Sequence, residues 1–255
     1  MRLIRIIPLL MIKDSNLYKS KQFDNFSYIG DIYNAAKIFS EKKAHEIILL
    51  DINASKNKKN FNIELIKKIR QEIFIPLTVG GGINSIDDVS NLIENGVEKV
   101  SINNAFYSNK NLVKEISSKY GSQSVTVSID VRNIDNEYRA FILNGTKKIS
   151  ENLIDLLKRA EGEGAGEILL TSIDKEGMQS GYDIDLYESI QDSISIPLIA
   201  HGGCNDIKSI NNLFEKTKIS TVAASSFFIY YGSRNAVLIN YPLVEDIDVI
   251  MEKFK

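Results

Sequence analysis

Short apolar runs alternate with longer amphipathic segments along this chain, and that alternation most limits the folds open to it. The short runs are rich in β-branched residues and apolar at most positions, which is typical of strands covered on both faces in a parallel sheet. Eight such runs occur, at residues 3–8, 46–52, 75–79, 99–102, 124–129, 167–172, 196–200 and 219–223. Segments with helical spacing lie between them, among them residues 63–74, 85–95, 153–164 and 207–216.

Strand–helix alternation repeated eight times predicts an α/β fold, a single (β/α)8 TIM barrel. The length of 255 residues suits one such domain, although it would also suit two small ones. A doubly wound open sheet is the structural alternative. The predicted helix caps are Asn60 and Ser85 at N-termini and Gly96 and Gly164 at C-termini.

The sequence also resembles itself at an offset of 121 positions. Residues 46–50 match residues 167–171, and residues 75–77 with the following glycine pair match residues 196–198 with theirs. A period near half the chain length favours two half-barrels of four strands, about 1–122 and 123–255, within one barrel domain. An open sheet does not explain this repeat.

Composition excludes several classes of partner. The net charge is −2, which gives no electrostatic reason to expect nucleic acid or an anionic membrane. Cys204 is the only cysteine, so no intrachain disulfide can form. The apolar run at residues 1–14 is interrupted by Arg5, is too short to span a membrane and lacks a cleavage site. We therefore expect a cytoplasmic protein, with no metal and no cofactor, because His45, His201 and Cys204 show no ligand spacing.

Two glycine pairs follow the third and seventh predicted strands. Glycines at a strand-to-helix turn let the backbone approach an anion and direct N–H groups at it. A single pair would more simply be a tight turn, but two copies related by the repeat favour two phosphate sites and a long ligand phosphorylated at both ends. The residues concerned are Gly81, Gly82, Gly202 and Gly203, with the small polar strand ends Asn103, Asn104, Ala224 and Ser225.

Two carboxylates fall at the predicted barrel mouth. Asp130 ends the fifth strand, where barrel enzymes place catalytic groups, and is a candidate general acid or base; a loop cap is the alternative. Asp51 ends the second strand and is equally compatible with a substrate-hydroxyl ligand and a structural acceptor.

Four charged residues fall at the opposite end, near the starts of strands one, two, four and six. Two cations and two anions can close into a neutral ring around the barrel axis, since unpaired burial costs too much. On the pattern alone, a layer of salt bridges that only stabilises the barrel is the simpler interpretation. The four are Arg5, Glu46, Lys99 and Glu167.

Over nearly its full length the chain resembles the HisF family, the cyclase subunit of imidazole glycerol phosphate synthase. The most specific stretches are residues 76–83, 99–103, 121–123 and 164–172. The resemblance implies a HisH-like glutaminase docked on the N-terminal face, with ammonia passing through the barrel. It makes the charged ring the gate of that path, with Gln123 beside the path. It implies catalysis by Asp130, and ligand binding by Gly177, by the phosphate residues named above and by Lys19 on a closing loop.

The departures from that pattern change the expected activity. The family's first-strand catalytic aspartate is Met11 here, and a thioether cannot transfer protons. Around the mouth, Glu176, Met178, His201 and Asn104 also depart; His201 would reshape one phosphate site or serve as a hydrogen-bonded loop residue. Residues 232–242 resemble a HisF-like branch associated with amidation of bacterial surface sugars, which implies a third, ATP-dependent amidotransferase as a further partner.

Three functions stay open at this point. The first is an ammonia-conducting subunit for sugar amidation. The second is the cyclase of histidine biosynthesis, with Asp130 acting alone or with another group. The third is a non-catalytic scaffold that activates a glutaminase.

Overall fold

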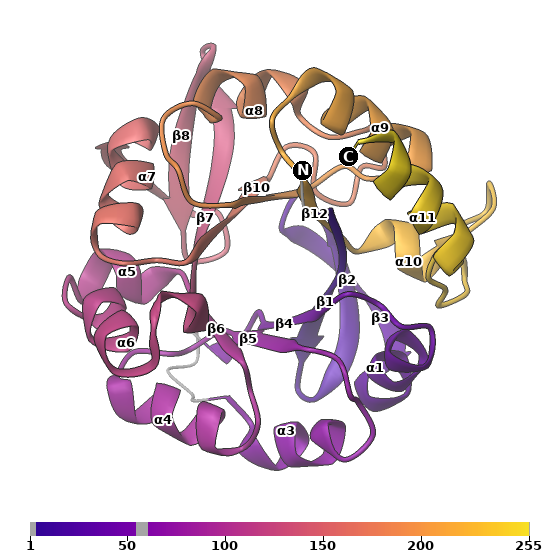
Figure 1. Ribbon diagram of the computed structural model, residues 1–255, viewed down its shortest axis with the longest axis horizontal. Helices are drawn as coiled ribbons and strands as arrows, with labels where there is room; N and C mark the ends of the chain where they lie inside the picture. The colour runs from indigo at the N-terminus through magenta and orange to yellow at the C-terminus, as the bar shows by residue number, and fades with distance from the viewer. Residues whose placement is uncertain (1–3, 55–60, 255) are drawn as a thin grey trace.

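The computed structural model describes residues 4–54 and 61–254 and shows a closed barrel of parallel strands surrounded by helices (Figure 1). Within these residues, eight strands pair in parallel around a ring that closes between β12 and β1. This confirms the predicted (β/α)8 barrel and rules out an open sheet. The barrel strands are β1 (Arg5–Lys13), β4 (Ile47–Asp51), β5 (Leu77–Gly80), β6 (Lys99–Ile102), β7 (Val125–Ile134), β10 (Glu167–Ser172), β11 (Leu198–His201) and β12 (Thr221–Ala224).

Helices cover the outside of the barrel because each has one apolar face to bury against the strands. None of the helices in the described part of the chain is both long and apolar enough to cross a membrane. The helices are α1 (Ile32–Glu41), α3 (Ile63–Arg70), α4 (Ile86–Glu94), α5 (Asn104–Ser108), α6 (Leu112–Tyr120), α7 (Leu153–Gly162), α8 (Ile184–Ile190), α9 (Ile207–Lys216), α10 (Ser226–Ile229), α11 (Val244–Lys253) and the 3₁₀ turn η1 (Ser122–Ser124).

Local capping signals account for several helix ends. Ser85 caps α4 through a reciprocal capping box with Asp88, as predicted. Gly96 and Gly164 each lie one residue beyond a helix C-cap, with φ of +88° and +95°, so left-handed glycines stop α4 and α7 there. The other predicted N-cap, Asn60, lies outside the described residues, and the side chain that caps α3 is Asn62.

Two antiparallel hairpins, which the sequence analysis did not predict, extend the barrel at its mouth. The first consists of β2 (Asn16–Lys21) and β3 (Asp24–Asp31) and follows β1; the second consists of β8 (Glu137–Ile142) and β9 (Lys147–Asn152) and follows β7. Their parent strands run five residues past their predicted ends at residues 8 and 129. A third, small hairpin of β13 (Tyr230–Tyr231) and β14 (Ala236–Val237) projects beside α10 and α11 (Figure 1).

Successive side chains of a strand point to opposite faces, so every second residue faces the barrel interior. The inward-facing residues of neighbouring strands form layers along the barrel axis. On β1 the residues of this alternating set are Arg5, Ile7, Leu9 and Met11. Arg5 lies at the strand start, and Met11 lines a cavity at the carboxyl end. Between them an apolar cluster, separate from the main core, fills the middle of the barrel; it includes Ile7, Leu9, Ile48, Leu169, Ile199 and Ala223.

Candidate active site

A closed ring of charged side chains spans the strand-start end of the barrel. The Arg5 guanidinium lies 2.6 Å from a Glu167 carboxylate oxygen and 3.3 Å from one of Glu46. Lys99 Nζ lies 2.9 Å from Glu46 and 3.2 Å from Glu167. Thr78 Oγ1 also donates to Glu46 at 2.6 Å. The structure therefore brings all four predicted residues together in alternating sign, and each charge contacts two opposite charges.

Gln123, which the resemblance connects with an ammonia path, lies on η1 at the same end of the barrel. Its side chain is exposed, and its Nε2 donates to the Tyr120 carbonyl at 2.9 Å. The side chain thus bonds to its own neighbouring turn and not to the charged ring.

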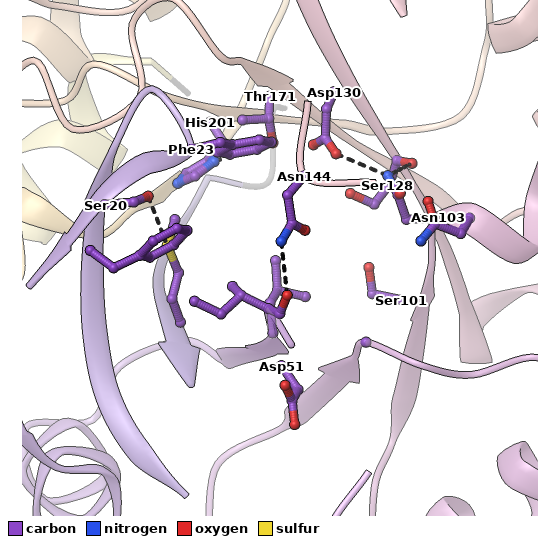
Figure 2. Close-up of a pocket in the computed structure, with 16 residues that line it drawn as sticks. Ser20, Phe23, Asp51, Ser101, Asn103, Ser128, Asp130, Asn144, Thr171 and His201 are labelled. Carbon is purple, nitrogen blue, oxygen red and sulfur yellow. Dashed lines mark hydrogen bonds between the residues drawn. The ribbon is translucent and has the colours of Figure 1, made fainter. Parts of the chain in front are cut away.

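The opposite, carboxyl end of the barrel holds an open cavity (Figure 2). Met11 and residues from the two hairpins, including Phe23 and Asn144, line it together with the ends of the barrel strands. Among the described residues that line it, no lysine or arginine occurs, and the ionisable side chains are Asp51, Asp130 and His201. The described lining therefore supplies no positive charge to attract a phosphate.

Asp130 is the carboxylate in this cavity with an altered proton affinity. It is buried at the end of the barrel portion of β7, and Asn103 Nδ2 donates to its Oδ2 at 3.0 Å. Burial raises the pKa of Asp130 to about 7, although hydrogen bonds from Asn103 and Thr171 act in the opposite direction. Asn103 is oriented by a second bond to the Ser128 carbonyl at 2.9 Å. At neutral pH this carboxyl group can both hold and release a proton, which suits a general acid or base.

Met11 and His201 offer no second proton donor beside Asp130. Met11 Sδ accepts a hydrogen bond from Ser20 Oγ at 3.4 Å, and a thioether does not titrate. Burial lowers the pKa of His201 to about 3, and the Lys19 charge acts in the same direction. His201 is therefore a neutral imidazole, and its Nδ1 lies 3.2 Å from Thr171 Oγ1. His201 thus has the hydrogen bond of one interpretation, but it ends β11 instead of lying in a loop, and it lines both this cavity and the cavity of the second predicted phosphate site.

Asp51 has a mainly structural environment. Its Oδ1 accepts hydrogen bonds from the backbone N–H groups of Asn53 at 2.9 Å and Ala54 at 3.0 Å. Figure 2 shows the Asp51 carboxylate directed away from the cavity centre, on the side opposite Asp130. Of the two interpretations left open by the sequence, these bonds favour the structural acceptor.

The residues of the two predicted phosphate sites are not gathered equally well in the structure. In the first, Gly81 lines the main cavity with Asn103 and Asn104, but Gly82 lines a separate depression beside Ile83. Asn104 Oδ1 accepts from the Leu143 N–H at 3.1 Å. The residues of the second predicted phosphate site line one smaller cavity together. Its lining consists of Lys19, Glu176, Gly177, His201, Gly202, Gly203, Cys204, Ala224, Ser225 and Ser226.

Gly81 of the first predicted phosphate site is also required by the fold. Gly81 has φ of +109°, and a Cβ there would lie 2.3 Å from the Asp51 carbonyl oxygen. We expect Gly81→Ala to lower the free energy of unfolding by roughly 3 kcal/mol, since strain and a backbone clash add. Chemical denaturation measures this. Gly30→Ala is the matched control, because a Cβ at that position would meet nothing within 4 Å; equal losses in both variants would contradict the expectation.

Several lining residues escaped the sequence analysis because they lie on the unpredicted hairpins. Phe23 and Phe26 come from the β2–β3 hairpin, and Asn144 comes from the β8–β9 turn, where its Nδ2 donates to the Ile52 carbonyl at 2.9 Å. Thr171 was missed for another reason: it was seen only as part of the repeat and not as a neighbour of Asp130 and His201. Alternation along β10 from Glu167 could have placed it at the mouth.

Comparison with known proteins agrees with this geometry. The profile of the family described as histidine biosynthesis protein matches residues 5–234. A Pseudomonas aeruginosa protein named as a putative imidazole glycerol phosphate synthase subunit hisF2 is 42% identical over 96% of this chain and 98% of its own length. A putative HisF subunit of Leptospira borgpetersenii is 42% identical over 93% and 94%. The imidazole glycerol phosphate synthase subunit HisF of Hydrogenobaculum is 42% identical over 88% and 89%.

Proposed function

The chain belongs to the HisF family of imidazole glycerol phosphate synthase subunits, and from this premise we propose that it receives ammonia from a HisH-like glutaminase and passes it on for amidation of a surface-polysaccharide sugar. The observation that carries the proposal is the division of charge along the barrel axis. A closed ring of ion pairs lies at one end, and the described lining of the cavity at the other end has no lysine or arginine. A cytoplasmic location is part of this proposal.

The ring and the layer above it suit the passage of a small neutral base. Paired charges offer hydrogen-bond donors and acceptors where an incoming molecule leaves water. The apolar cluster that includes Ile7, Leu9 and Leu169 then favours neutral ammonia over ammonium, because an unpaired ion has a large desolvation cost. In this proposal the glutaminase docks on the strand-start face, and Arg5, Glu46, Lys99 and Glu167 form the entrance.

The mouth cavity supports delivery of ammonia better than ring closure on a doubly phosphorylated substrate. Among the described lining residues, a phosphate beside Gly81, Asn103 and Asn104 would meet no cationic side chain. Asp130 is a carboxyl group that can exchange a proton near neutral pH. Met11, which also lines the cavity, occupies the position where the family resemblance leads us to expect a second catalytic carboxyl group. We propose that Asp130 accepts or orients the emerging ammonia and that an ATP-dependent amidotransferase carries out the final step on the sugar.

The alternative function is the cyclase of histidine biosynthesis. The names of the relatives favour it, and the pKa of Asp130 suits one of the proton transfers that cyclisation needs. It would have to proceed with one titrating carboxyl group where two are expected, which we expect to cost at least ~10²-fold in rate.

One assay separates the two functions. The protein is given the phosphoribulosyl aminoimidazole-carboxamide substrate with ammonium salt, and imidazole glycerol phosphate is measured against the Hydrogenobaculum HisF relative as positive control. We expect turnover at least ~100-fold below that relative. Turnover equal to the relative would overturn sugar amidation in favour of the cyclase.

A further inference from the structure

The smaller cavity, to which Lys19 of β2 contributes, has polar groups without a partner among the residues that the structure describes. It lies next to the main cavity and has room for about one water-sized group, and His201 lies in the wall between the two cavities. Within the described residues, the Ser225 and Ser226 hydroxyls that line it are buried, at 4% and 5% exposure, and have no hydrogen-bond partner. Buried hydroxyls without partners cost free energy, so a ligand that bonds to them would be stabilised there.

Lys19, the one lysine or arginine among the described residues of this lining, is already paired with Glu176. Lys19 Nζ forms an ion pair with the Glu176 carboxylate, and the two side chains are only 3% and 1% exposed. Glu176 Oε2 also accepts from Ser20 Oγ at 2.9 Å and from the Phe23 N–H at 3.5 Å. The carboxylate is therefore fixed to the hairpin by several donors, and it takes the place that an anionic ligand of Lys19 would occupy.

Electrostatics then decide what the cavity accepts. Desolvation lowers the pKa of Lys19, so its buried ammonium depends on a nearby anion to stay charged. A phosphate dianion that paired with Lys19 would displace Glu176 and leave that carboxylate buried without a counter-ion, which is strongly unfavourable. An uncharged group meets no such penalty and can bond to both serine hydroxyls.

We propose that Glu176 sets the specificity of this second cavity: it excludes phosphate and leaves a site for an uncharged, hydroxyl-bearing group such as the end of a sugar or polyol. The proposal goes beyond ammonia transfer and does not depend on it. It implies a ligand with a phosphate at no more than one end.

The test follows the backbone amide signals of Gly203, Ser225 and Ser226 by NMR while inorganic phosphate or glycerol is added. In the wild type we expect no saturable shift with phosphate and a weak, saturable shift with glycerol. In Glu176→Gln we expect phosphate to bind at least ~10-fold more tightly, since one charge-assisted contact to Lys19 becomes free. Glu64→Gln is the matched control, because it makes the same charge change at an exposed ion pair on α3.

Saturable phosphate shifts at these amides in the wild type, equal to those in Glu176→Gln, would overturn the proposal. A wild type that responds to phosphate but not to glycerol would do so as well. These wild-type measurements decide the matter even if Glu176→Gln unfolds because Lys19 loses its partner. A failure here leaves the ammonia assay untouched, since that assay reads product formation and not binding in this cavity.

Discussion

Asp130→Asn is expected to gain stability relative to the wild type as pH rises from about 4 to 8, by on the order of 4 kcal/mol over that range. Burial raises the pKa of Asp130 from 3.8 to about 7 in the folded protein. Between these values the unfolded chain has lost the proton and the folded protein has kept it, so the wild-type free energy of unfolding falls with pH. Asparagine has no proton to lose and avoids this loss.

Urea denaturation of both proteins across this pH range measures the effect, with Asp248→Asn on the exposed face of α11 as control. The control should track the wild type to within a few tenths of a kcal/mol at every pH. A constant difference between Asp130→Asn and the wild type would show that Asp130 ionises as readily in the fold as in water. That result would remove the proposed proton transfer at the mouth, because the carboxylate would then hold no proton at neutral pH.

The barrel itself could be predicted from sequence because its strands carry a local signal. Buried parallel strands need continuous apolar runs, and β6 and β10 have the bounds that their runs predicted. The same holds for α9, whose predicted range 207–216 agrees with the structure and whose apolar residues recur at helical spacing. The charged ring was accessible for a related reason, since residues at the starts of parallel strands converge on one end of a barrel.

Two of the turns at the mouth could not be predicted, because they lack the usual glycine signals, whereas the β8–β9 turn carries the signal Asn144-Gly145, which the sequence analysis did not use. The β2–β3 turn places Gln22 and Phe23 at φ of +54° and +64°, and the β7–β8 turn places Asp135 and Asn136 at +52° and +64°. Left-handed turn positions usually attract Asn-Gly or Asp-Gly pairs, and neither of these two turns has one. Tertiary contacts impose these conformations; Gln22 N, for example, donates to the Glu176 carbonyl at 2.9 Å.

The ion pairing and pKa values of the site could not be predicted from sequence, because they depend on residues that are distant in the chain. The Lys19–Glu176 pair joins residues 157 positions apart, on segments with no matching local pattern. The pKa of Asp130 depends on burial, which arises from the packing of β7 against neighbouring strands and the hairpins. Sequence identified Lys19 and Asp130 as candidates through family resemblance, but the neutralisation of one and the raised pKa of the other follow from their surroundings.

Lys99→Met is expected to destabilise the protein by about 3 kcal/mol and to reduce use of glutamine-derived ammonia more than use of added ammonium. Lys99 contacts both Glu46 and Glu167, so its loss leaves two carboxylates to share Arg5 at the end of the barrel. Denaturation measures the first effect. Paired assays of the complex with its glutaminase, run with glutamine or with ammonium chloride, measure the second.

Two further variants show whether the ring acts as a gate or only as a stabilising layer. Lys67→Met breaks an exposed ion pair with Glu64 and should cost less than about 1 kcal/mol. Lys99→Met with Glu167→Gln removes one charge of each sign and should recover part of the lost stability, because fewer carboxylates are left unpaired. If the double variant regains stability while glutamine-dependent activity stays low, the ring serves ammonia entry. If stability and glutamine-dependent activity recover together, the ring is only a stabilising layer, because the loss of folding alone would then explain the lost activity.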